Sequence, residues 1–165
     1  TYQVTAFYLR SSGSSVTVRE EIPDKYWYGR KPTLIQSLVG EEAEKAIVQV
    51  EAAVKSYPYR RMYELWPGPN SNTFVSHIIR NVDGLTVELP PNAIGKDFLG
   101  VTRFWAKSES GTGVQVSVLG ILGFTFGLAE GIEINIMTLV FGIDFLSPAL
   151  KLPMVGRIGM ADRPV

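Results

Sequence analysis

Ser71 is the residue of this chain whose position is best suited to covalent chemistry. It lies in the run Asn70-Ser71-Asn72-Thr73, directly before apolar residues that recur at helical spacing through Val82. A nucleophile at a helix N-terminus experiences a positive field that stabilises its anion, and neighbouring backbone N–H groups can hold an oxyanion. The pattern is therefore compatible with a Ser71-dependent hydrolase or acyltransferase that acts on amide or ester bonds.

The same run also has a purely structural explanation. Asn, Ser and Thr side chains at a helix start accept hydrogen bonds from backbone N–H groups, which stabilises the helix by about 1 kcal/mol. A catalytic serine needs a base, and the single histidine, His77, lies about 9 Å further along the same helix. His77 therefore cannot reach Ser71 while the helix is intact. Approach of Glu64, Lys96 or Asp97 from another segment is left open by the sequence.

Two helices and several strands are expected to position this run. Residues 41–57 carry apolar side chains at i, i+3, i+4 and i+7, which predicts a helix, and residues 72–82 predict a second one. A flexible connection is expected at residues 11–15. Strands are predicted, from β-branched and aromatic composition or from alternation, at residues 2–9, 16–18 and 59–66.

From Val114 onward, apolar residues alternate with small or polar ones. The alternating sets are 114/116/118, 124/126/128 and 132/134/136, and glycines separate the three runs. This period of two predicts an antiparallel β-meander with one buried face. An apolar stretch over residues 116–129 ends at Glu130, short of the ~20 residues that a membrane-spanning helix needs. Contact of the other sheet face with a membrane or a partner protein is left open, because little polar surface remains.

These elements together predict one α+β domain over residues 1–165. In this fold two main helices pack on an antiparallel sheet, with the Gly-rich meander in the C-terminal half. Residues 152–159, which glycine and proline interrupt, are expected to wrap around the sheet.

The composition excludes several classes of function. The formal net charge is zero, which gives no electrostatic footprint for nucleic acid. The chain has no cysteine and a single histidine, so neither a thiol nucleophile nor an all-protein transition-metal site is expected, and no cofactor is predicted. The sequence begins at Thr1 without a methionine, signal or transit segment, which is compatible with a further segment upstream.

Aromatic residues provide the other candidate binding positions. Tyr26, Trp27 and Tyr28 are consecutive in a loop, where they form either an aromatic ligand cage or packing at the edge of the core. Trp66 directly precedes the Pro67-Gly68-Pro69 turn. We therefore add these four residues to Asn70 and Asn72 as candidate binding residues.

Several motifs resemble an uncharacterised bacterial domain-of-unknown-function family, DUF3750. The longest and most specific of them is Trp66-Pro67-Gly68-Pro69-Asn70-Ser71-Asn72-Thr73-Phe74. The others are Trp27-Tyr28-Gly29, Gly40-Glu41-Glu42-Ala43, Ile47 with Glu51-Ala52-Ala53, Tyr57-Pro58-Tyr59, Glu88 through Asp97, Lys151-Leu152-Pro153 and Gly156-Arg157. The resemblance covers most of the chain from about residue 23 onward.

The run at 70–74 is also similar, more weakly, to the Asn-Cys-Asn-x-Phe box of circularly permuted papain-like (NlpC-type) peptidases and acyltransferases. The resemblance implies a papain-like fold in which Ser71 occupies the position of the nucleophilic cysteine. In those proteins a histidine from an earlier strand acts as the base, and a His-x-Trp element follows the first strand. Here residues 11–16 read Ser-Ser-Gly-Ser-Ser-Val, and no histidine precedes His77.

Since the expected base is missing, we favour a non-catalytic binding or structural accessory subunit. Its expected partners are other protein subunits, within a membrane-associated assembly of the bacterial cell envelope or of an organelle. The Ser71-dependent hydrolase or acyltransferase is the first alternative. A lipid or small-ligand binder that uses the apolar sheet and the loop at 26–28 is the second.

Overall fold

The structure is a computed structural model that describes residues 1–22, 26, 29–32 and 34–160. Its fold is α+β, with three helices and nine strands among these residues. In chain order the elements are β1 (Tyr2–Val4), α1 (Ala6–Ser12), β2 (Val16–Val18), α2 (Gly40–Ser56), α3 (Ser71–Arg80), β3 (Trp105–Lys107), β4 (Gly113–Val118), β5 (Leu122–Gly127), β6 (Gly131–Ile136), β7 (Leu139–Asp144), β8 (Ala149–Leu152) and β9 (Gly156–Gly159).

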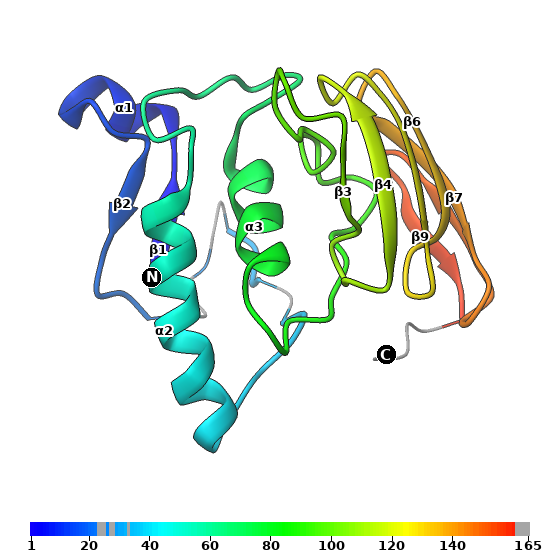
Figure 1. The fold of residues 1–165 in the computed structure, drawn as a ribbon, viewed down its shortest axis with the longest axis horizontal. Helices are drawn as coiled ribbons and strands as arrows, with labels where there is room; N and C mark the ends of the chain where they lie inside the picture. Colours follow the sequence, from blue (N-terminus) through cyan, green and yellow to red (C-terminus); the bar gives the residue numbers. More distant parts are fainter. Residues whose placement is uncertain (23–25, 27–28, 33, 161–165) are drawn as a thin grey trace.

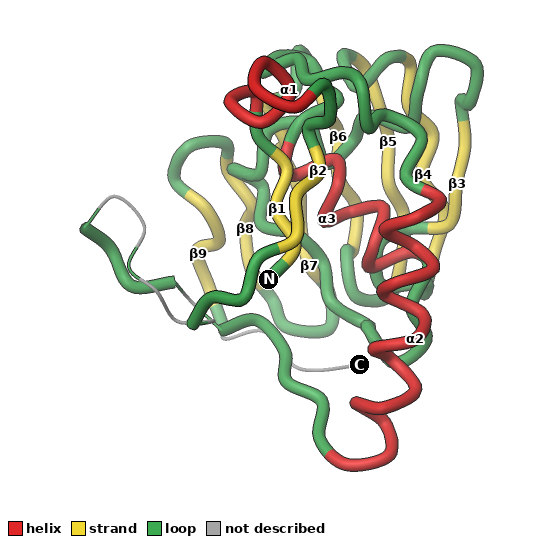
Figure 2. Tube along the Cα trace, turned by 90° about the vertical axis from the view of Figure 1, so that its left-hand side faces the viewer, coloured by secondary structure: helices red, strands yellow, loops and turns green. Residues whose placement is uncertain are grey.

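The elements form layers with α3 in the middle (Figure 1). On one side of α3 lie α2 and the small antiparallel sheet β1–β2, and on the other side lies the large sheet. Figure 2, seen from the side of β1 and β2, shows the small sheet and α2 in front of α3, with the large sheet behind. Of the two main helices, α3 alone lies next to the large sheet, whereas α2 packs on α3.

The hydrophobic core lies on the α2 side of α3. Its largest cluster joins β1 and β2 to both helices through Val4, Val16, Val54, Tyr57 and Phe74. Two smaller clusters extend it along α3 to Val82 and Leu89. The predicted helices at 41–57 and 72–82 are confirmed within two residues at each end.

The N-terminal segment differs from the predicted strand over residues 2–9. Strand β1 ends at Val4, and α1 begins because the Thr5 side chain accepts a hydrogen bond from the Tyr8 backbone N–H at 3.3 Å. Gly13 ends this helix in the left-handed conformation, with φ of 73°. The prediction was therefore wrong beyond Val4, and the expected flexible connection is partly helical, because a local cap outweighs β propensity.

The strand predicted at residues 59–66 is absent, although the segment is described throughout. Its backbone groups bond to other loops: the Arg60 carbonyl accepts from the Ser15 N–H at 2.7 Å, and the Glu64 N–H donates to the Pro69 carbonyl at 2.8 Å. These contacts close a loop against β2 and the proline turn. Alternating side chains therefore did not imply pairing, since no neighbouring strand was available.

The predicted meander is confirmed and is longer than expected. Seven antiparallel strands follow one another in the order β3 to β9, each paired with its sequence neighbours. Residues 152–159 do not wrap around this sheet as expected. They form the end of β8, the turn after it and strand β9, in which Ile158 pairs with Leu150 of β8.

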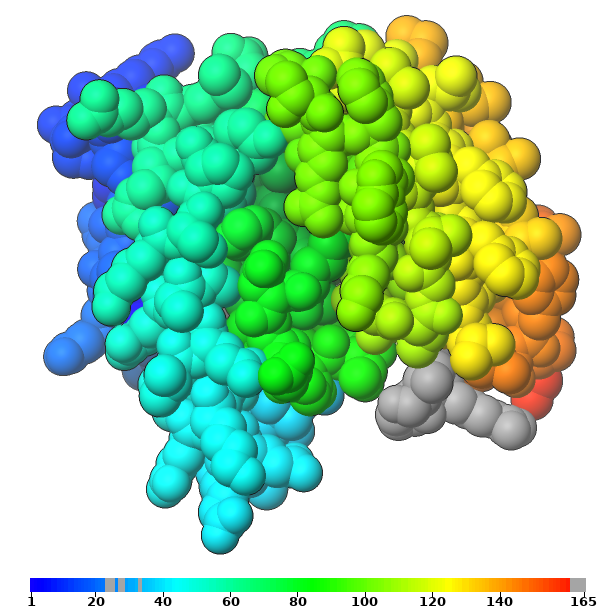
Figure 3. Space-filling view, in the orientation of Figure 1, coloured from blue at the N-terminus to red at the C-terminus, as the bar shows by residue number. Residues whose placement is uncertain are grey.

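The two faces of this sheet have the opposite of the usual polarity. The inner face, towards α3, carries buried Gln115, Thr125, Glu133 and Lys151 in one cross-strand row. The outer face carries apolar side chains at the intervening positions, and these are largely exposed. In Figures 1 and 3 the meander, coloured light green to red, lies at one side of the molecule, and Figure 1 shows the three helices on the other side.

Candidate functional site

Asn70 is the residue that starts α3. Its Oδ1 accepts hydrogen bonds from the backbone N–H groups of Asn72 at 2.9 Å and Thr73 at 3.2 Å. In return, the Thr73 hydroxyl accepts from the Asn70 backbone N–H at 3.1 Å. This reciprocal capping box satisfies the free N–H groups of the first turn, and both side chains are buried.

The same side chains attach the helix start to the loop at residues 94–95. Asn70 Nδ2 and Asn72 Nδ2 both donate to the Ile94 carbonyl, at 3.0 and 2.8 Å. The Thr73 hydroxyl donates to the Gly95 carbonyl at 2.7 Å. Gly95 has φ of 93°, and a Cβ atom there would lie 2.3 Å from the Asn70 side chain. Three members of the predicted run therefore hold two segments together.

Ser71 is the residue of the run 70–73 whose side chain makes none of these hydrogen bonds. It is exposed, and its hydroxyl makes no hydrogen bond to any residue of the described ranges. The candidate bases Glu64, Lys96 and Asp97 form no hydrogen bond with it, and Lys96 and Asp97 are buried on the sheet side of α3. The geometry therefore leaves this serine without an activating group among the described residues.

His77 contacts α2 instead of Ser71. Its Nε2 lies 3.0 Å from the Ala53 carbonyl and 3.4 Å from the Ser56 hydroxyl. The imidazole packs edge-on against Tyr57, with the ring centroids 5.4 Å apart. Burial lowers the pKa of His77 below its ordinary value, and nearby Arg80 lowers it further, whereas the bond to Ala53 opposes the shift. A neutral imidazole that donates to α2 has a role in packing the two helices.

Two of the four aromatic candidates, Tyr26 and Trp66, are among the residues that the structure describes. Trp66 donates from its indole Nε1 to the Met137 carbonyl at 3.3 Å, which joins the proline turn to the β6–β7 turn. Tyr26 is 65% exposed, so it is not part of the core. Trp27 and Tyr28 lie outside the described residues, and the proposed aromatic cage stays a prediction.

Between α3 and the large sheet lies a group of charged residues that the sequence did not predict as a cluster. We call it the buried ionic cluster; its members are Arg80, Glu88, Lys96, Asp97, Glu109, Glu133 and Lys151. Glu133 is its centre, with Oε2 2.8 Å from Lys96 Nζ and Oε1 3.0 Å from Lys151 Nζ. Lys151 also binds Glu88 Oε2 at 2.5 Å.

Arg80 connects α3 to the other side of this cluster. Its guanidinium donates to the Gln115 amide oxygen and lies 3.9 Å from Glu109 Oε1. Gln115 in turn donates to Asp97 Oδ1 at 2.5 Å. Polar side chains on the inner face of the sheet therefore bind charged side chains of α3 and of the loop at 88–97.

Burial sets the protonation of the carboxyl groups in the cluster. It raises the pKa of Glu88 to about 7 in spite of the adjacent Lys151, and raises that of Asp97 to about 6. Glu133 is equally buried, but contact with Lys96 and Lys151 holds its pKa below the ordinary value. One cluster thus contains a firmly ionised carboxylate and two carboxyl groups that titrate near neutral pH.

The side chains of the cluster bind one another, and most of them are almost completely buried. Among the described residues, no group of three or more His, Cys, Asp or Glu could hold a metal ion. Sequence reasoning missed the cluster because its members lie in five separate segments. The one available signal was the polar set Gln115, Thr125, Glu133 within the alternating strands.

Comparison with known proteins identifies the family of this chain. The sequence profile of DUF3750, described as a protein family of unknown function, matches residues 1–98. The chain belongs to DUF3750. The matched DUF3750 region includes α1 to α3, the capped helix start and the loop up to Phe98. The large sheet follows it. No curated protein and no solved structure shows a significant match to the chain.

Proposed function

We propose that this DUF3750 chain is a non-catalytic binding subunit that docks on another protein through the outer face of its large sheet. The observation that carries the proposal is the composition of that face. Strands β4 to β7 present Val, Leu, Ile and Phe at every outward position, in cross-strand rows such as Val114–Phe126–Ile132–Ile143 and Val118–Leu122–Ile136–Leu139. On those strands no outward side chain is charged or polar.

Most of these apolar side chains are exposed. Phe126, Ile143 and Ile136 are each more than 50% exposed, whereas Ile132 in the first row is partly buried. Large contiguous apolar patches on a folded protein mark sites of association. A polar inner face and an apolar outer face are expected of a sheet whose outer face meets another surface.

The dimensions of the face suit a protein partner. Strands β4 to β7 are ~20 Å long and the other three are shorter, so at a spacing of ~4.8 Å the seven strands give a projected area of about 570 Å². This approaches the ~800 Å² that each partner contributes to a standard protein interface. A second sheet or an amphipathic surface packed ~10 Å above this face would cover all three apolar rows.

The structure of the α3 N-terminus supports the non-catalytic part of the proposal. Asn70, Asn72 and Thr73 have structural partners, and the hydroxyl of Ser71 has no base among the described residues. A papain-like relationship is part of the same proposal, because α3 begins at the equivalent of the nucleophile and packs on an antiparallel sheet. In this view the chain retains the architecture of such an enzyme without its catalytic base.

None of the helices in the described part of the chain is both long enough and apolar enough to cross a lipid bilayer.

The test uses two charge substitutions in the centre of the outer face. Phe124 and Phe141 are 45% and 43% exposed and flank Ile134 in one row, so Phe124→Lys/Phe141→Lys is expected to fold. The matched control is Val48→Lys/Leu65→Lys, which changes residues 68% and 75% exposed that lie outside the sheet.

The tagged chain and both variants are expressed in their native cells and separated by native mass. The proposal predicts that the wild type and the control migrate in a complex with a different protein, and that the outer-face variant migrates alone. A variant that remains in the complex would contradict it. A complex that contains only copies of this chain, or sedimentation with protein-free vesicles in place of a complex, would also count against it.

A further inference from the structure

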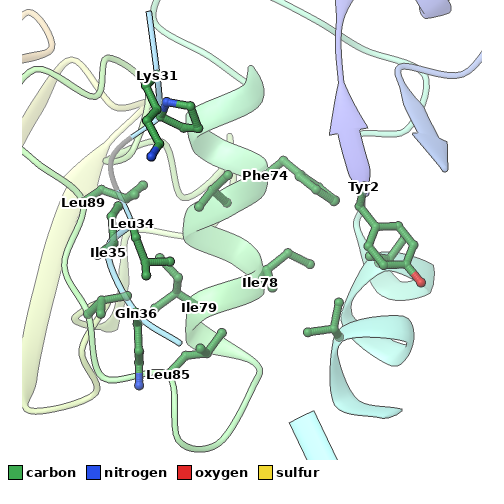
Figure 4. Close-up of a pocket in the computed structure, with 15 residues that line it drawn as sticks. Tyr2, Lys31, Leu34, Ile35, Gln36, Phe74, Ile78, Ile79, Leu85 and Leu89 are labelled. Atoms are coloured by element: carbon green, nitrogen blue, oxygen red, sulfur yellow. The ribbon is translucent and has the colours of Figure 1, made fainter. Parts of the chain in front are cut away.

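A second feature of the molecule, a cavity beside α3, suggests a ligand. A cavity of about 630 Å³ lies along α3, between this helix, α2, β1 and the segment at residues 31–36 (Figure 4). Its volume is within the range of small-molecule sites in proteins, about 300–1,000 Å³. It is separate from the capped helix start, from the buried ionic cluster and from the outer sheet face.

The walls of this cavity are almost entirely aliphatic. Along α3 they consist of Phe74, Val75, Ile78 and Ile79, and the facing wall includes Leu34, Leu85, Val87 and Leu89. A ligand body with hydrogen-bonding groups would leave those groups unpaired, at a considerable cost in free energy. The lining therefore selects a ligand with a purely apolar body.

One end of the cavity differs from the rest. Among the described residues of the lining Lys31 is the single charged one, and Figure 4 shows it at the end of the cavity opposite Gln36 and Leu85. An apolar lining with one cationic end is complementary to an apolar chain with one anionic end.

Two aliphatic side chains of the lining are largely exposed. Leu34 is 78% exposed and Ile35 is 55% exposed, although both line the cavity. Two large aliphatic side chains would lose this exposure if an alkyl chain lay between them and α3.

We propose that this cavity binds a long-chain alkyl carboxylate, with its carboxylate at Lys31 and its alkyl chain along α3 towards Leu85. The burial of the alkyl chain supplies most of the affinity, and Lys31 selects the charged head group. The site does not depend on the proposed docking of the outer face.

Palmitate, below its micellar concentration, is titrated into the purified chain by calorimetry, with hexadecanol as the uncharged comparison. We expect saturable binding of one palmitate per chain. Leu34→Asp places a carboxylate on the apolar wall at an exposed position, and is expected to weaken binding at least about tenfold. Its matched control is Leu65→Asp, at another leucine of similar exposure outside the cavity, which should bind as the wild type does.

Lys31→Met tests the head group separately. The partly exposed ion pair predicts about a twofold to fivefold loss for palmitate and no loss for hexadecanol. The outer-face variant Phe124→Lys/Phe141→Lys should retain palmitate binding. The proposal is overturned if the wild type does not bind palmitate, if Leu34→Asp binds as well as Leu65→Asp, if Lys31→Met weakens the acid and the alcohol equally, or if the outer-face variant alone loses binding.

Discussion

Two adjacent substitutions at the start of α3, Asn70→Ala and Ser71→Ala, are expected to have very different effects on stability. Asn70 is 3% exposed and makes four side-chain hydrogen bonds to backbone groups, two as an acceptor in the cap and two as a donor to Leu65 and Ile94. Ser71 is exposed, and its hydroxyl has no partner within the described ranges. Comparison of the two substitutions therefore distinguishes a residue that caps the helix from a neighbouring residue whose side chain makes no such contact.

The magnitude follows from these bonds. Loss of an asparagine cap costs about 0.5–2 kcal/mol. Loss of the two donors to carbonyls at 3.1 and 3.0 Å adds about 1 kcal/mol each. Asn70→Ala should thus lower the free energy of unfolding by about 3 kcal/mol. Ser71→Ala should change it by less than about 0.5 kcal/mol, since alanine is also the better helix former.

The assay is urea unfolding followed by far-ultraviolet circular dichroism, with the wild type and both variants at one protein concentration. The difference in midpoint, multiplied by the common slope, gives the change in the free energy of unfolding. Equal destabilisation by the two substitutions would refute the assignment of the cap to Asn70. A large effect of Ser71→Ala alone would show that Ser71 has a structural partner that the present geometry does not include.

Three further outcomes follow from the buried ionic cluster and from Ser71. Glu133→Gln leaves Lys96 and Lys151 without their shared carboxylate, and should lower the free energy of unfolding by about 3–5 kcal/mol, whereas Glu44→Gln on the exposed face of α2 should leave it unchanged in the same urea assay. Burial raises the pKa of Glu88 from 4.5 to about 7, so the folded state binds more protons than the unfolded state between these values, and stability falls as the pH rises through this window. Urea midpoints measured across it should decline less steeply in Glu88→Gln; an unchanged slope would contradict this origin. A fluorophosphonate probe should label the wild type no more than Ser71→Ala, and labelling that the substitution abolishes would restore the hydrolase hypothesis.

The reversed polarity of the large sheet explains how one structural unit accommodates both the cluster and the outer face. Alternation places polar and apolar residues on opposite sides of each strand whichever side is buried. Here the polar side is buried because α3 and the loop at 88–97 supply Arg80, Lys96 and Glu88 as partners. The apolar side is then left outward, which is what the docking proposal requires.

Local physical chemistry was sufficient for much of the secondary structure. The apolar spacing of residues 41–57 and 72–82 predicted both main helices, and the period of two from Val114 onward predicted the meander. Both patterns depend on residues close in sequence, and so can be interpreted without the fold. The capping residues at 70–73 were recognised for the same reason, although the sequence left open which of the three side chains forms the cap.

The remaining features depend on residues that are distant in the chain. The segment at 59–66 alternates like a strand but has no neighbour to pair with, and Thr5 redirects the first strand into a helix. The contact between Lys96 and Glu133, which are 37 positions apart in the sequence, helps to determine which face of the meander is buried. The period of two in the sequence determines that each strand has a polar and an apolar face. The charged residues of other segments determine which of the two faces is buried, and only the tertiary structure shows where those residues lie.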